Sequence, residues 1–271
     1  MHNIRTYNAI SSKGLDRFAA DSYTVSDDCS APEGFILRSQ KLHAEPVPES
    51  LLAVARAGAG VNNIPVADYT KQGIVVFNTP GANANAVKEL IVAGLLLGSR
   101  DIFGGMSYVQ ELGHMNDPAE MGKLLEKEKK RFAGTEIEGK TLGVVGLGAI
   151  GSIIANLALD LGMDVIGYDP AISVEAAWQL SSRVKRMDSI EALLAEADFL
   201  TLHVPAIPAT KHLINAQALS GMKSTAKILN FAREEIVCTE DMVVALDKGV
   251  IAGYISDFPA PALLGREDVL L

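Results

Sequence analysis

The chain has 271 residues, of which 48% are hydrophobic and 21% charged, a composition typical of a globular protein rather than a disordered one. Its net charge of −9 argues against nucleic acid and anionic membranes as partners, because both require clustered cations. Cys29 and Cys238 form no CxxC pair, so the sequence predicts neither a disulfide framework nor a metal site.

Targeting features are also missing from the sequence. The longest apolar stretch, Glu89–Gly98, is too short to cross a bilayer and predicts a buried helix. The first residues, MHNIRTYNAI, lack the basic start and long apolar centre of a secretory signal, so we expect a cytoplasmic protein. The basic run Lys127–Arg131 follows Glu126 and is typical of a solvated helix face.

Short β-branched runs alternate with longer helical patterns along the chain. The predicted strands are Phe35–Leu37, Leu51–Val54, Ile74–Phe77, Thr141–Val145, Val165–Tyr168, Phe199–Leu202, Lys227–Asn230 and Gly253–Asp257. This alternation predicts parallel sheets flanked by helices.

The predicted strands fall into two sets. The first set occupies roughly residues 1–94 and the second begins near Lys140, with an apolar helix, Ala84–Gly98, and a polar Met- and Glu-rich stretch between them. Ligands of such sheets collect beyond the carboxyl ends of the strands, so we expect the site in a cleft between two domains.

A glycine-rich motif opens the second set. The segment TLGVVGLGAIG runs from a predicted strand through Gly146, Gly148, Ala149, Ile150 and Gly151 into a helical pattern. Gly146 permits a tight turn, Gly148 lets the backbone approach a pyrophosphate, and Gly151 lets helix and strand pack closely. Because strand, helix and second strand are all in place, the motif predicts a dinucleotide site.

Asp169 ends the second strand of this unit, close to the spacing of about 20 residues expected for a carboxylate that binds the ribose hydroxyls. This favours NAD over NADP. The alternative is a turn-forming role, because Asp169 precedes Pro170 and Asp-Pro often starts a loop.

Five segments resemble, in order, the phosphoglycerate dehydrogenases among the D-2-hydroxyacid dehydrogenases. They are RAGAGVNNI at 56–64, FNTPGANANAVKEL at 77–90, GKTLGVVGLGAIG at 139–151, LHVP at 202–205 and LNFAREEIV at 229–237. The resemblance implies an α/β chain with two doubly wound parallel sheets. These are a flavodoxin-like substrate-binding domain over 1–94, incomplete at its C-terminus, and a Rossmann NAD-binding domain over 95–271.

The resemblance also implies a reaction, in which C2 of 3-phosphoglycerate loses a hydride to NAD in serine biosynthesis. Arg233 matches the catalytic arginine that grips the substrate carboxylate, although Glu234 stands where the family has glycine. A surface arginine capping the next helix is the alternative for Arg233. Gly58 and Gly60 resemble the turn whose N–H groups receive the carboxylate, although AGAG alone is simply a flexible turn.

Arg38 and Arg56 are the candidates for binding the substrate phosphate, because two guanidiniums on adjacent strand ends can clamp a dianion. Arg38 also has the ordinary interpretation of an exposed strand-end arginine. The resemblance assigns further cofactor contacts to several turns, where a packing role for His203 is equally compatible with the sequence. These residues are Thr79, His203, Val204, Pro205, Phe231, Ala232 and Asp257.

The general base that the resemblance implies is a histidine in a PHxG turn, and no segment of the chain matches it. The sequence stops at Glu267–Leu271, and Asp257-Phe258-Pro259 is not followed by the family's orienting glutamate. We therefore expect a fragment that binds NAD and turns over poorly.

Two alternative functions remain open. They are a dehydrogenase for an unphosphorylated acid, such as glycerate or hydroxypyruvate, and a non-catalytic NAD-sensing protein. The resemblance further implies a homodimer or homotetramer.

Overall fold

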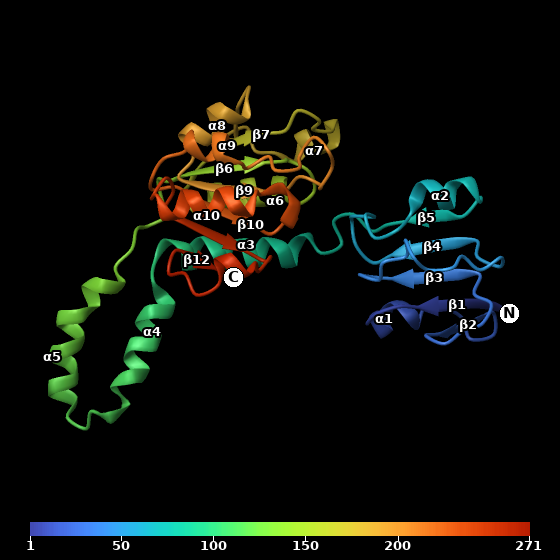
Figure 1. The fold of residues 1–271 in the computed structure, drawn as a ribbon, viewed down its shortest axis with the longest axis horizontal. Helices are drawn as coiled ribbons and strands as arrows, with labels where there is room; N and C mark the ends of the chain where they lie inside the picture. Colours follow the sequence, from blue (N-terminus) through green and yellow to red (C-terminus); the bar gives the residue numbers. More distant parts are fainter. The chain divides into compact units, whose positions relative to one another are not determined.

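A computed structural model describes all 271 residues. The chain divides into two compact units, Met1–Asn83 and Ala84–Leu271. Each unit is built on one sheet, drawn in blue and cyan for the first unit and in green to red for the second (Figure 1).

The first unit holds a five-stranded parallel sheet of order β2-β1-β3-β4-β5, the flavodoxin-like order. The strands are β1 (His2–Thr6), β2 (Tyr23–Ser26), β3 (Gly34–Leu37), β4 (Ala53–Arg56) and β5 (Val75–Phe77), with helices α1 (Ser12–Leu15) and α2 (Val66–Lys71). Its core centres on Phe35, Leu37 and Val54, which lie on the two central strands.

The second unit holds a seven-stranded sheet of order β12-β11-β10-β9-β6-β7-β8, in which every pair of neighbours is parallel. Its strands are β6 (Thr141–Val145), β7 (Asp164–Tyr168), β8 (Lys185–Arg186), β9 (Phe199–Leu202), β10 (Lys227–Asn230), β11 (Gly253–Ser256) and β12 (Val269–Leu270). The order reverses at β6, as in a dinucleotide-binding sheet. The two sheets confirm the predicted fold class.

Helices cover the second sheet. They are α6 (Gly151–Asp160), α7 (Val174–Gln179), α8 (Ile190–Glu196), α9 (Ala216–Ser220) and α10 (Thr239–Asp247), with the short turns η3 (Glu234–Ile236) and η4 (Pro261–Leu263). Apolar side chains from α6, α8, α9 and α10 and from both faces of the sheet form two core clusters. Burial on both faces explains why β6 and β9 are mostly apolar and do not alternate between apolar and polar residues.

Helix α3 (Ala84–Ser99) belongs to the second unit, so the units divide at residues 83/84 rather than at the 94/95 boundary predicted from the sequence. Its small residues explain this placement. A Cβ on Gly94 would lie 3.2 Å from side-chain atoms of Leu229 and Phe231, and one on Gly98 would lie 3.0 Å from Ile255. The helix therefore lies close against β10 and β11 along its glycine face.

The stretch between α3 and β6, in which the sequence indicated a solvated helix face only at Lys127–Arg131, is largely helical. It contains α4 (Ile102–Glu111), η1 (Leu112–His114), α5 (Pro118–Glu128) and η2 (Lys129–Phe132). No single helix has the length and apolar character to span a membrane. Helix α3 and the segment Ile102–His114 reach those values only as a pair, and they bend by 66° at their junction.

Some strand predictions need correction. The strand predicted at Leu51–Val54 lies at Ala53–Arg56, which brings Arg56 into the sheet. Leu51 is buried but precedes the strand, so this apolar residue packs in the core without pairing in the sheet. Strands β1, β2, β8 and β12 were not predicted; β8 and β12 have two residues each, and β2 lies at a sheet edge.

Candidate functional site

The glycine-rich loop follows β6, which lies between β7 and β9. Gly146 has φ +90°, a conformation that favours glycine, and its N–H donates to the Tyr168 carbonyl at 2.9 Å. A Cβ on Gly146 would lie 2.9 Å from backbone atoms of His203. Both backbone conformation and space therefore require glycine here.

Gly148 and Gly151 play different parts in the same loop. Gly151 opens α6, and a Cβ there would overlap the Gly146 carbonyl oxygen, so its role is close packing. A Cβ on Gly148 would meet nothing within 4 Å, and Gly148 is exposed. Together with exposed Ala149 and half-buried Ile150, it forms an accessible backbone surface before the N-terminus of a ten-residue helix. Such a surface fits a pyrophosphate.

Asp169 joins the loop to the end of β7. One carboxylate oxygen accepts the Leu147 N–H at 2.8 Å, and the other accepts the Ala171 N–H at 2.9 Å. The second contact is the turn-forming role that the sequence allowed. Each oxygen keeps a further lone pair, so the carboxylate retains capacity for ribose hydroxyls while it fixes the loop.

His203, Val204 and Pro205 follow β9 beside the loop. The His203 backbone N–H donates to the Val145 carbonyl at 2.8 Å, and its ring Nε2 lies 3.0 Å from Thr201 Oγ1. Burial lowers the pKa of His203 to about 4, so the ring is neutral at pH 7. Its backbone forms the wall against which Gly146 packs, while the cofactor contact expected for His203 stays a prediction.

Arg233 lies in the turn that follows β10, after half-buried Phe231 and Ala232. Its Nη1 donates to the Ala232 carbonyl at 2.6 Å, and it makes no side-chain cap of η3. Exposed Asp257 follows β11, and its N–H donates to the Asn230 carbonyl at 3.2 Å. Because these strands are parallel, Arg233 and Asp257 lie at the same edge of the sheet as the glycine-rich loop.

In the first unit, Arg38 and Arg56 lie at the ends of the neighbouring parallel strands β3 and β4. Arg56 Nε donates to the Arg38 carbonyl at 3.1 Å. A Cβ on Gly58 would lie 2.8 Å from Arg56 Nη1, so the glycine makes room for the guanidinium. Thr79 completes this group, because its N–H donates to the Gly58 carbonyl at 3.0 Å and its Oγ1 to the Arg56 carbonyl at 3.3 Å.

Gly60, also named from the sequence, is half-buried in the same turn. The structure adds Asn8, which sequence reasoning missed. Its Oδ1 lies 3.3 Å from the Arg38 backbone nitrogen and 2.9 Å from those of Ser39 and Gln40. Asn8 has φ +64° and lies two residues after the end of β1; the preference of asparagine for such turn conformations is the one local signal for it.

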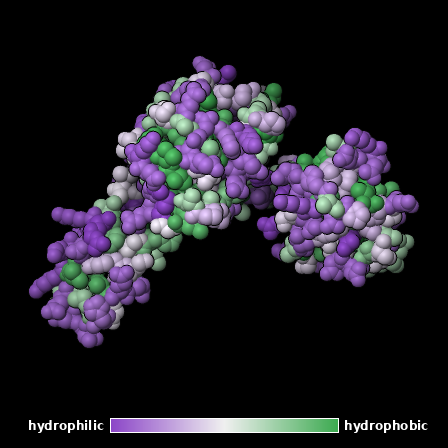
Figure 2. Space-filling model, viewed as in Figure 1, coloured by the Kyte–Doolittle hydropathy of each residue, from purple (hydrophilic) through white to green (hydrophobic).

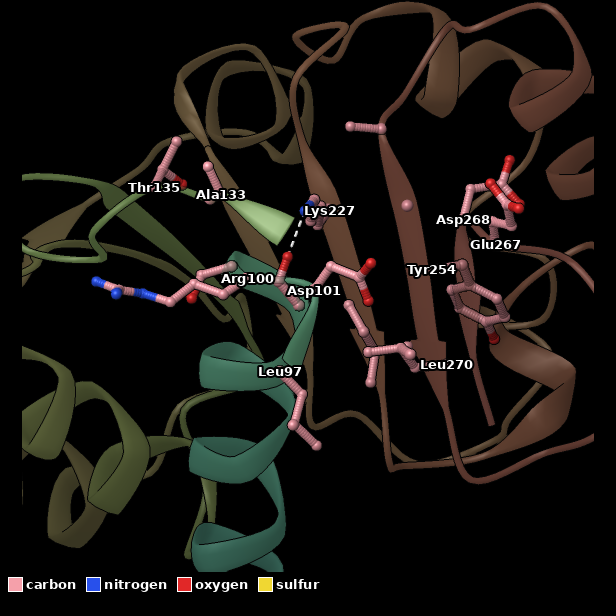
Figure 3. A pocket seen from close by; sticks show the side chains of 16 residues that line it. Leu97, Arg100, Asp101, Ala133, Thr135, Lys227, Tyr254, Glu267, Asp268 and Leu270 are labelled. Atoms are coloured by element: carbon pink, nitrogen blue, oxygen red, sulfur yellow. Dashed lines mark hydrogen bonds between the residues drawn. The ribbon is translucent and has the colours of Figure 1, made fainter. Parts of the chain in front are cut away.

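Two cavities of the second unit flank opposite edges of its sheet. One of about 360 Å³ adjoins Asp169 and is also lined by Leu147, Gly167 and Arg186. The other, of about 290 Å³, lies where β10 and β11 begin (Figure 3). There Lys227 donates from Nζ to the Gly98 carbonyl at the end of α3, and burial lowers the pKa of its ammonium.

Comparison with known proteins identifies the family to which this arrangement belongs. Residues 105–270 match the model of the D-isomer specific 2-hydroxyacid dehydrogenase NAD-binding domain, which confirms NAD as the predicted cofactor. The chain is 39% identical over 237 residues to a D-3-phosphoglycerate dehydrogenase of Synechocystis, covering 86% of this chain and 40% of that protein. It is also 39% identical over 209 residues to that of Methanocaldococcus jannaschii, covering 77% of the chain and 37% of the relative.

The chain thus spans about 40% of the length of these curated relatives. Among solved structures, a glyoxylate/hydroxypyruvate reductase from Sinorhizobium meliloti superposes with a TM-score of 0.82 at 22% identity, covering 100% of this chain and 86% of that one. This likeness shows the shared fold. The chain belongs to the D-isomer specific 2-hydroxyacid dehydrogenase family, and its second unit carries the NAD-binding domain of that family.

Proposed function

We propose that this chain is part of an NAD-dependent dehydrogenase that oxidises 3-phosphoglycerate at C2, in serine biosynthesis. The observation that carries the proposal is the edge of the second sheet, where the open Gly148 backbone and the Arg233 turn both follow parallel strands. The curated relatives named D-3-phosphoglycerate dehydrogenase support the choice of substrate.

Each candidate residue has a chemical task in this proposal. When bound, NAD supplies the acceptor for the C2 hydride. Gly146–Gly151 present backbone N–H groups and the α6 N-terminus to its phosphates, while Asp169 accepts from the ribose hydroxyls. Arg233 holds the substrate carboxylate and polarises the C2 oxygen, since a guanidinium stays charged and offers parallel donors. The backbone of Gly58 and Gly60 also serves the carboxylate.

Arg38 and Arg56 bind the phosphate in this proposal. Their strands are adjacent, and the bond from Arg56 Nε to the Arg38 carbonyl fixes the two residues side by side. Two guanidiniums give an acidic protein a local site for a dianion. A dehydrogenase of glycerate or hydroxypyruvate has no need of this pair, which distinguishes the proposal from that alternative.

Calorimetric titration of NADH-saturated chain with 3-phosphoglycerate and with glycerate tests the phosphate site. Replacing both arginines, Arg38→Ala with Arg56→Ala, should weaken phosphoglycerate binding at least tenfold, because each charged hydrogen bond contributes about 1.5–3 kcal/mol. Binding of glycerate should stay unchanged. Lys13→Ala with Arg17→Ala, which removes two exposed cations of the same unit, controls for the loss of two positive charges. Equal losses for both acids would favour an unphosphorylated substrate.

We further propose that these 271 residues bind NAD well but turn over slowly, because a base must accept the C2 hydroxyl proton. His2, His43, His114 and His212 are exposed and lie outside the turns after β10 and β11, and His203 is held beside Thr201. General acid–base catalysis is worth about 10²–10⁴-fold. Titration with NAD tests the predicted binding, and an assay of NADH formation tests the predicted slow turnover. An ordinary dehydrogenase rate would contradict the slow turnover. NAD binding without any turnover would instead favour a sensing role.

A homodimer is the assembly that the surface of α4 favours. Ile102, Phe103, Met106 and Val109 are 40–61% exposed on this one helix. Where Figure 1 draws α4 and α5, Figure 2 shows green hydrophobic surface among purple hydrophilic surface. Since exposed apolar patches mark interaction surfaces, we propose that two copies pair there. Light scattering should give a dimer mass for the wild type and a monomer mass for Met106→Glu with Val109→Glu, while an unchanged mass would contradict the proposal.

A further inference from the structure

Asn230 is the last residue of β10 and is fully buried, with a relative exposure of 0%. Its side chain closes the turn that carries Arg233. Oδ1 accepts the Ala232 N–H at 3.2 Å, while Nδ2 donates to the Arg233 carbonyl at 2.9 Å. One amide therefore holds the backbone on both sides of the peptide that joins these two residues.

The orientation of this amide is determined by its partners. The Ala232 N–H can only donate and the Arg233 carbonyl can only accept, so exchanging Oδ1 and Nδ2 would break both bonds. Nδ2 also donates to the Tyr254 hydroxyl at 3.3 Å, and Tyr254 is 4% exposed on the neighbouring strand β11. The Asn230 side chain is thus fixed from two strands.

The guanidinium of Arg233 makes few interactions that would fix its position. Its hydrogen bond is to the adjacent Ala232 carbonyl, and it belongs to none of the ion pairs of the chain. The direction in which it leaves the sheet edge therefore depends on the backbone of residues 230–233. That backbone is held by Asn230 through its side chain, and through its carbonyl, which accepts from Ser256 Oγ at 3.4 Å.

We propose that Asn230 is a positioning residue for Arg233, aiming the guanidinium at the substrate carboxylate through the two hydrogen bonds of its side chain across the turn. This inference rests on the proposed function, in which Arg233 binds that carboxylate. Positioning matters because misplacing a reactive group by about 1 Å can cost about a hundredfold in rate. A buried amide with three partners provides such a fixed support.

The test compares Asn230→Asp with Tyr254→Phe in the full chain. Asn230→Asp keeps the shape and the acceptor for Ala232 but loses the donor to the Arg233 carbonyl, whereas Tyr254→Phe leaves both bonds across the turn in place. Calorimetry should show phosphoglycerate binding to NADH-saturated Asn230→Asp weakened about tenfold or more. NADH affinity should change less than about twofold, and Tyr254→Phe should match the wild type within about twofold.

A double-mutant cycle separates positioning from general loosening of the structure. In an Arg233→Ala background, Asn230→Asp should cost less than about twofold in phosphoglycerate affinity, because the residue it positions is gone. The inference would be overturned if Asn230→Asp weakened phosphoglycerate binding by the same factor with and without Arg233. It would also be overturned if Asn230→Asp alone bound phosphoglycerate with wild-type affinity. Asn230→Ser, too short to reach the Arg233 carbonyl, serves if the aspartate variant does not fold.

Hydrogen exchange provides a readout that does not require substrate. Without ligand, Asn230→Asp or Asn230→Ser should raise the exchange rate of the Ala232–Ile236 amides about tenfold, while Tyr254→Phe should not. Unchanged exchange in both Asn230 variants would overturn the inference. Failure of the wild-type chain to bind phosphoglycerate, with exchange behaving as expected, would instead overturn the proposed function and leave Asn230 as the residue that orders this turn.

Discussion

Gly148→Ala should separate cofactor binding from folding. The added Cβ meets nothing within 4 Å, and the backbone of Gly148 lies outside the positive-φ region. Without ligand the methyl group is accommodated, so the free energy of unfolding should change by less than about 1 kcal/mol. In our account, the exposed backbone of Gly148 is the surface against which the pyrophosphate lies.

A methyl group at this position holds the pyrophosphate away from the N–H groups of the loop. A hydrogen bond to a charged group contributes about 1.5–3 kcal/mol. Losing one such bond should therefore raise the dissociation constant of NADH about ten- to hundredfold. The same change should appear for NAD, because the pyrophosphate is common to both.

The single tryptophan of the chain provides the assay. Trp178 is 84% exposed on α7, the helix that follows Asp169, and NADH absorbs the light that tryptophan emits. Titration with NADH should quench Trp178 by energy transfer. Gly122→Ala on α5, where an added Cβ also meets nothing within 4 Å, is the matched control. Wild-type NADH affinity in a folded Gly148→Ala variant would refute this placement of the pyrophosphate.

Three further changes follow from the same loop. Gly151→Ala should lower the free energy of unfolding by at least about 2 kcal/mol in denaturant titrations, since its Cβ overlaps the Gly146 carbonyl; unchanged stability would contradict this close packing. Asp169→Ala should cost about 1–3 kcal/mol of stability, as well as NADH affinity, because the buried Leu147 N–H loses its acceptor; normal values of both would contradict its role. The pKa of His203 is about 4 in the folded chain and about 6.5 in the unfolded chain, so its neutral ring contributes to the free energy of unfolding above pH 6.5. This contribution is lost as the pH falls from 6.5 towards 4, because the unfolded chain then binds the proton more readily. The drop is about 3 kcal/mol, so the advantage of wild type over His203→Gln should shrink by about that amount between pH 7 and pH 4, and a constant advantage would contradict a neutral, buried ring.

The sequence predicted the glycine-rich turn after β6 well because its constraints are local. Gly146 needs a positive φ, and Gly151 must avoid a carbonyl five residues earlier in the chain. Strands β6, β9 and β10 were predicted with their observed bounds, since each has buried apolar residues on both faces of the sheet.

Contacts between distant segments were not predictable in this way. Asn230 looks like an ordinary polar strand end, and its role depends on Tyr254 and on a turn whose shape is not visible in the sequence. Asn8 acts on backbone N–H groups of the strand β3 terminus, about 30 residues away. Strand β1 (HNIRT) lacks a clear apolar alternation, although it lies between β2 and β3. In each case tertiary pairing, rather than local preference, decides the structure.

Transfer of deuterium tests the central claim most directly. The chain is incubated at length with NAD and 3-phosphoglycerate carrying deuterium at C2, and the reduced cofactor is analysed by mass spectrometry, which detects even slow turnover. We predict deuterated NADH from the wild type, less from C2-deuterated glycerate, less from Gly148→Ala at NAD concentrations below saturation, and none above background from Arg233→Ala. NADH without deuterium, or equal labelling by wild type and Arg233→Ala, would contradict the proposed hydride transfer.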